Sequence, residues 1–97
     1  MFSEHELKKI RPRLPGYKSG TDITQLFFGF VKKVEGDVGE LRIKEPESRR
    51  YFSMNVSAEY LQQRGLSDSG GDNLFAGVEY TDVSHRKRLE LVKLTED

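Results

Sequence analysis

The sequence predicts a mainly β protein, a small barrel of five short strands with one helix at the N-terminus and a short helix between strands three and four. Apolar and polar residues alternate over short segments, which indicates strands with one buried face. Gly29 and Gly77 interrupt the two most apolar of these segments, as is typical of strands that bend between two faces. Closing such strands into a barrel also removes exposed sheet edges.

The first 22 residues are expected to form a helix and an arm that precede a barrel domain of residues 23–97. Ser3 is a suitable helix cap, and Glu6, three residues later, completes a capping box. Pro12 ends the helix because it has no N–H group and disfavours helical geometry at Arg11. A helix this short is not stable alone, so it is expected to dock on the barrel through its apolar residues. These are Phe2, Leu7 and Ile10.

The barrel domain divides into alternating segments and turns. The expected strands are residues 23–34, 40–44, 49–56, 74–83 and 89–95. After the third strand, Ser57 is a good N-cap for a helix over residues 58–64, and Gly65 can end that helix. Turn-forming or charged residues fill the connections between these elements.

This order of elements resembles the OB-fold, a small five-stranded barrel. In that fold a helix between strands three and four closes one end of the barrel, and the first strand contributes to both sheets. The glycine inside the first strand, Gly29, fits that arrangement. SH3-like and Sm-like barrels are the alternative, since they also have five strands and can carry an N-terminal helix. Their third and fourth strands, however, are joined without a full helix.

The composition argues against several functional classes. The chain has no cysteine, which excludes disulfide scaffolds, thiolate metal sites and cysteine nucleophiles. Its two histidines lack further ligands at metal-binding spacing, and no phosphate-binding loop or catalytic triad pattern is present. We therefore expect no enzyme, no metal and no cofactor. The sequence has no apolar leader and no segment long enough to span a membrane, so we expect a cytoplasmic protein.

An OB-like barrel predicts a ligand face on the outer side of strands two and three, flanked by the loops between strands one and two and between strands four and five. Alternation places Arg42, Lys44 and Tyr51 on this face, and Arg49 is in phase with Tyr51. The loop before the last strand adds three cations. The predicted nucleic-acid-binding residues are therefore Arg42, Lys44, Arg49, Tyr51, Arg86, Lys87 and Arg88. Single-stranded DNA or RNA requires cations along its phosphates and rings on which bases stack, and either Phe27 or Phe28 could supply a second ring.

Other features favour a protein–protein interaction module instead. Sixteen basic residues balance sixteen acidic ones, and Glu35 and Asp37 place negative charge in the loop between strands one and two. Solvent-facing strand residues are also commonly Lys or Arg. In this alternative the chain is a homodimer, a subunit of a larger assembly, or a small viral or plasmid-encoded protein. Its contacts would be a strand edge or the apolar surface of strands one and four.

Overall fold

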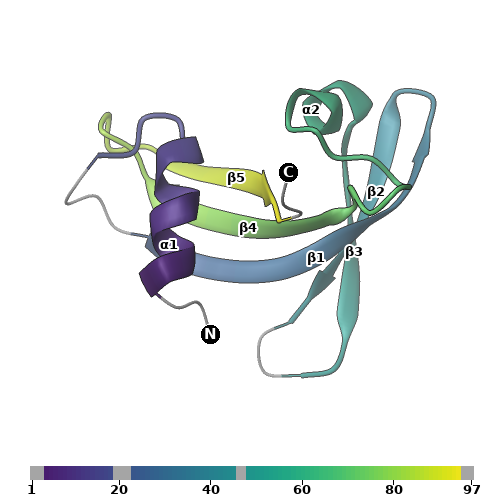
Figure 1. Cartoon of the computed structure of the whole chain (residues 1–97), viewed down its shortest axis with the longest axis horizontal. Helices are drawn as coiled ribbons and strands as arrows, with labels where there is room; N and C mark the ends of the chain where they lie inside the picture. The colour runs from purple at the N-terminus through teal and green to yellow at the C-terminus, as the bar shows by residue number, and fades with distance from the viewer. Residues whose placement is uncertain (1–3, 19–22, 46–47, 95–97) are drawn as a thin grey trace.

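The computed structural model describes residues 4–18, 23–45 and 48–94, which form one antiparallel sheet with two short helices (Figure 1). The elements are α1 (Glu4–Ile10), a 3-10 turn η1 (Arg11–Arg13), β1 (Ile23–Glu35), β2 (Val38–Lys44), β3 (Tyr51–Ser57), α2 (Ala58–Gln63), β4 (Leu74–Thr81) and β5 (Lys87–Lys93). The prediction of a mainly β protein is confirmed. All five strands of the predicted barrel domain are present, with small shifts at their ends.

The five strands form one open sheet, so the barrel that the sequence predicted is not confirmed. Its strand order is β3-β2-β1-β4-β5, so β1 is central and β3 and β5 are the two edges. Side chains from other elements reach the outer edge of β5. The hydroxyl of Tyr60 in α2 accepts a hydrogen bond from the Leu91 N–H at 3.1 Å, and Arg13 of η1 donates to the Lys93 carbonyl at 3.0 Å. A strand cannot pair with these groups while the side chains hold them.

The sheet is buried on both faces over β4, with one core on each side. The α2-side core contains the buried residues Val31, Leu41, Ile43, Leu61, Leu66, Phe75 and Leu91. The α1-side core contains Ile10, Leu14, Ala76, Val78, Tyr80 and Val92. Figure 1 shows α1 crossing one end of the sheet near β4 and β5 and α2 lying toward the opposite end. Each helix therefore covers one face, and neither covers the whole of it.

Two glycines make room for two rings where β1 and β4 pair. The register places Phe27 opposite Gly77 and Gly29 opposite Phe75. A Cβ at Gly29 would lie 2.7 Å from Cζ of Phe75, and a Cβ at Gly77 would overlap the ring of Phe27. Each ring thus lies over the glycine of the other strand. The sequence predicted that these glycines mark bends, and in the structure they also permit this close packing.

The signals at the ends of the helices are largely confirmed. The hydroxyl of Ser57 accepts a hydrogen bond from the Tyr60 N–H at 3.1 Å, and Gly65 follows α2 with a φ of +72°. The α-helix of α1 ends at Ile10, before Pro12, as predicted. The predicted cap Ser3 and the apolar residue Phe2 lie outside the described residues. The helix docks through Ile10 together with Leu14, a residue of the arm that the helical pattern did not include.

Candidate nucleic-acid interface

The β2–β3 end of the sheet presents rings and cations on the face that α1 covers elsewhere. Phe30 of β1 pairs with Arg42 of β2, and Lys44 of β2 pairs with Tyr51 of β3. Phe28 lies opposite Ala76, a residue of the α1-side core, so all of them share that face. We call this uncovered part the exposed face; it comprises Phe28, Phe30, Arg42, Lys44, Tyr51 and Ser53. The structure thus brings together the strand residues that alternation had selected.

The aromatic side chains of the exposed face are accessible. Tyr51 is 49% exposed and Phe28 is 38% exposed. The rings of Phe30 and Tyr51 meet edge to face with centroids 5.8 Å apart, an arrangement that holds the Tyr51 ring in place. Phe27 points the other way and packs against the α2-side core. Only one of the two neighbouring phenylalanines points inward, as predicted, and Phe28 is the one on the exposed face.

The cations of the exposed face differ in how they are held. Arg42 forms an ion pair with Glu40 at 3.3 Å, and its Nε is buried without an acceptor among the described residues. Lys44 is exposed at the end of β2, and Arg49 is exposed in the turn that leads into β3. Within the described ranges, no carboxylate pairs with either of them. Lys44 and Arg49 are therefore the cations best placed to meet an anionic ligand.

The acidic turn between β1 and β2 lies away from these cations. Glu35 pairs with Val38 at the start of β2, six residues from Lys44, or roughly 20 Å along a strand. Lys33 lies 2.8 Å from Glu35, and its hydrogen bond and charge lower the pKa of the Glu35 carboxyl. Repulsion from this turn is consequently weak at the Lys44 end of the exposed face.

The basic loop of residues 84–88 does not flank the exposed face, contrary to the sequence-based prediction. Lys87 pairs with Thr81 and Arg88 with Tyr80, whereas Leu74 at the other end of β4 is the residue that pairs with Phe30. That separation is roughly 23 Å along β4. Figure 1 shows the β4–β5 turn at the far left, while the strands β2 and β3 lie right of the centre. Arg86, Lys87 and Arg88 thus form a separate basic segment.

Asp82 organises that distant loop from a buried position. Its carboxylate accepts hydrogen bonds from the backbone N–H groups of Ser84 at 2.8 Å and Arg86 at 3.0 Å, and Arg88 lies 3.5 Å away. His85 takes a φ of +62°, which is unusual for a residue with a side chain. The hydrogen bonds from Arg86 and Ser84, with the charge of Arg88, lower the pKa of Asp82. The sequence analysis gave Asp82 no role, because its partners are backbone groups of the loop that follows it.

We expect Asp82→Asn to reduce the dependence of stability on pH in the acidic range. A carboxyl whose pKa is lowered by folding stabilises the native state above its unfolded pKa of about 3.9. That stabilisation is lost as the pH falls through the lower native pKa. Urea unfolding at a series of pH values from neutral to about 2 checks this, and Asp72→Asn, at an exposed ion pair, is the control. Equal slopes in the native protein and Asp82→Asn would contradict the assignment.

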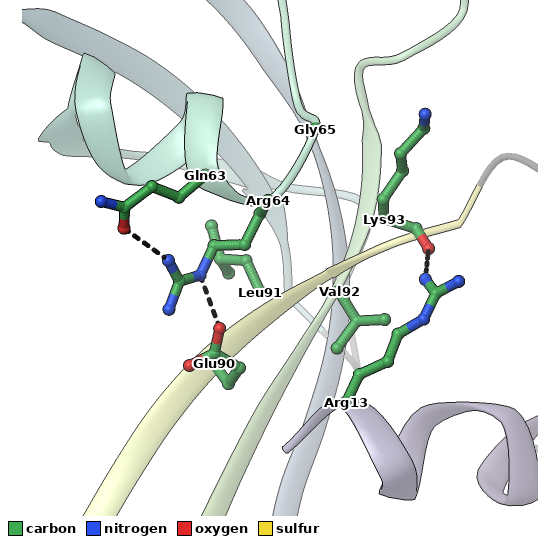
Figure 2. Close-up of a pocket in the computed structure, with 8 residues that line it drawn as sticks. All are labelled: Arg13, Gln63, Arg64, Gly65, Glu90, Leu91, Val92 and Lys93. Atoms are coloured by element: carbon green, nitrogen blue, oxygen red, sulfur yellow. Dashed lines mark hydrogen bonds and ion pairs between the residues drawn. The ribbon is translucent and has the colours of Figure 1, made fainter. Parts of the chain in front are cut away.

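A pocket of about 310 Å³ lies along the outer edge of β5 (Figure 2). Its lining residues are Arg13, Gln63, Arg64, Gly65, Glu90, Leu91, Val92 and Lys93. Arg64 donates to the buried carboxylate of Glu90 and lies over the Tyr60 ring at 3.6 Å from its centroid. Figure 2 shows Arg13 on the other side of the pocket, directed at the Lys93 carbonyl. Arg64 thus connects the end of α2 to β5, and Arg13 connects η1 to β5. Their partners are too distant in sequence to be predicted.

The described residues contain no group of three or more His, Cys, Asp or Glu that could hold a metal ion. No helix in the described ranges is long and apolar enough to cross a membrane. No family model matches the chain, and neither the curated proteins nor the solved structures include a match.

Proposed function

We propose that the chain is a non-enzymatic, OB-like module that binds single-stranded DNA or RNA through the Lys44 end of the exposed face. The observation that carries the proposal is the combination of an exposed ring with exposed cations. Tyr51 stands beside Lys44 across the β2–β3 pair, with Arg49 in the adjoining turn. In this arrangement a base stacks on Tyr51 while the flanking phosphates meet Lys44 and Arg49.

The remaining residues of the exposed face have supporting roles in this proposal. Phe28 offers a second ring for an adjacent base, two strands away from Tyr51. Phe30 fixes the Tyr51 ring through their edge contact. Arg42 is tied to Glu40, so most of its charge is already compensated and it contributes less to phosphate binding than Lys44. Ser53, which pairs with Arg42 from the edge strand β3, adds a hydroxyl to the face.

The topology supports the OB-like part of the proposal. β1 is the central strand and pairs with both β2 and β4, and α2 connects β3 to β4 while covering one side of the sheet. The candidate ligand face lies on β2 and β3, where OB-folds bind oligonucleotides. The open sheet is compatible with this proposal, since OB-folds are partly open barrels.

The proposal predicts salt-dependent binding of a fluorescently labelled single strand, measured by anisotropy. Single strands of dT and U of equal length are the probes, and the tighter of the two identifies the nucleic acid. Lys44→Glu with Arg49→Glu should weaken binding strongly and reduce the slope of log affinity against log salt by roughly 0.7 for each lost phosphate contact. Tyr51→Ala should weaken it by about 1–3 kcal/mol, the usual contribution of one stacked base.

The matched control is Arg86→Glu with Lys87→Glu, which changes charge equally at the distant loop. Over roughly 23 Å the effect of this change on the exposed face is screened, because the Debye length at 0.15 M salt is about 8 Å. Binding by the control should therefore stay close to that of the native protein. Equal losses in both double variants, or no binding of either strand at low salt, would contradict the proposed site.

A further inference from the structure

The two edges of the sheet are protected very differently. β5 carries Lys87, Arg88, Glu90 and Lys93, and side chains of α2 and η1 bond to its outer edge. β3, with the sequence YFSMNVS, has no charged residue, no proline and no bulge against β2. Soluble proteins normally protect an edge strand with one of these devices, because unpaired backbone groups recruit another strand. β3 is therefore an edge suited to pairing.

The backbone groups of alternate β3 residues point away from the sheet. The Glu45 N–H bonds to the Arg50 carbonyl, and the Ala58 N–H bonds to the Asp37 carbonyl. Residues 50 and 58 therefore face β2, and because alternate residues of an antiparallel strand face the same neighbour, residues 52, 54 and 56 also bond to β2. The outward residues are Tyr51, Ser53, Asn55 and Ser57, all exposed. Within the described part of the chain, no loop or turn bonds to the backbone groups of Tyr51, Ser53 and Asn55, whereas the carbonyl of Ser57 already caps the first turn of α2.

We propose that β3 pairs antiparallel with β3 of a second copy, centred on Met54, to form a two-fold symmetric dimer. Met54 is the middle residue of the seven in β3. In this register Phe52 lies opposite Val56 of the second copy, and Ser53 lies opposite Asn55. Ser53 and Asn55 then exchange both backbone hydrogen bonds with each other across the two copies, and the Ser57 N–H donates to the Tyr51 carbonyl of the other copy. Such self-complementary contacts are the usual basis of two-fold dimers.

The side chains of β3 match this register on both faces. Phe52 is 46% exposed, which is high for an aromatic residue, and its partner in the dimer is β-branched. On the other face polar residues meet polar residues, and no like charges approach. A register centred on Ser53 or Asn55 would also place apolar residues opposite apolar ones. It would, however, leave two residues at one end of β3 with no partner in β3 of the second copy. The Met54-centred register alone pairs all seven residues.

A cysteine introduced at the centre tests the register directly, because the chain has no cysteine of its own. With Met54→Cys, the two Cα atoms lie about 4.5 Å apart in a non-hydrogen-bonded pair, within the range of a disulfide. We expect a covalent dimer on non-reducing gels after mild oxidation. Ser53→Cys is the control. The two introduced cysteines are then diagonal neighbours across the dimer, about 7–8 Å apart, which is too far for a disulfide. Equal crosslinking of the two variants, or none, would overturn the proposal.

Light scattering tests for the dimer without crosslinking. It also avoids replacing Met54, which is partly buried. The native protein should have twice the 11.2 kDa mass of one chain and dissociate on dilution. Ser53→Lys with Asn55→Lys places like charges opposite each other and should give monomers. Ser53→Lys with Asn55→Glu makes the same two positions attractive and should restore the dimer. A native monomer at every soluble concentration, or identical behaviour of the two double variants, would refute this pairing.

Discussion

Gly77→Ala should lower the free energy of unfolding by about 1–3 kcal/mol, the usual cost of overpacking a core. Gly77 is buried in β4, and an added Cβ there overlaps the ring of Phe27 on the paired strand. The ring cannot simply withdraw, because it packs against the α2-side core. Gly77 has no positive φ, so the backbone accepts alanine and the effect reports the ring contact. Urea unfolding followed by circular dichroism measures the change.

A double-mutant cycle isolates that contact from other effects of the substitution. Phe27→Leu shortens the side chain and removes the ring that the new methyl group would meet. In the Phe27→Leu background, Gly77→Ala should therefore cost much less, with a coupling free energy of about 0.5–3 kcal/mol. Strictly additive free energies would show that the ring does not lie over Gly77.

Leu61→Ala is expected to destabilise the protein by about 2–5 kcal/mol, the range for truncating a buried leucine. Leu61 is 1% exposed, and its side chain fills the space above Gly39 of β2. α2 has only six residues and would not persist without this contact. Since small domains are stable by about 5–15 kcal/mol in total, the variant could lose much of its stability. Chemical denaturation gives the size of the loss.

The neighbouring variant Gln62→Ala serves as the control, because Gln62 is exposed on the same helix. It should change stability by no more than about 0.5 kcal/mol. Hydrogen exchange adds an independent reading, since the Leu91 amide bonds to Tyr60 of α2. In Leu61→Ala this amide should exchange faster, while that of Asp82, bonded within its loop, should be less affected. A loss of less than 1 kcal/mol in Leu61→Ala would contradict the packing described for α2.

Local patterns in the sequence predicted the elements and half of the candidate site. Period-two alternation located Arg42, Lys44 and Tyr51 on one face, because the face of a strand residue depends only on its position in the strand. Ser57 and Gly65 bounded α2 for an equally local reason, the hydrogen-bonding and backbone needs of helix ends.

Features set by distant partners could not be predicted in this way. The side chains that bond to the outer edge of β5 come from distant parts of the chain, and Arg13 meets Lys93 across 80 positions of sequence. The position of the 84–88 loop depended on the pairing register of β4, which places that loop at the other end of β4 from the strand residues near Arg42. Leu14 belongs to the α1-side core although it follows Pro12, where the helical periodicity ends.

Backbone amide NMR during titration with a short single strand tests the central claim most directly. If the exposed face binds nucleic acid, the largest shift changes occur at Lys44, Arg49 and Tyr51, with smaller changes at Phe28. The amides of Ser84 to Arg88 should move little, because that loop lies at the far end of β4. Changes confined to residues 84–88, or no change anywhere at low salt, would contradict the account.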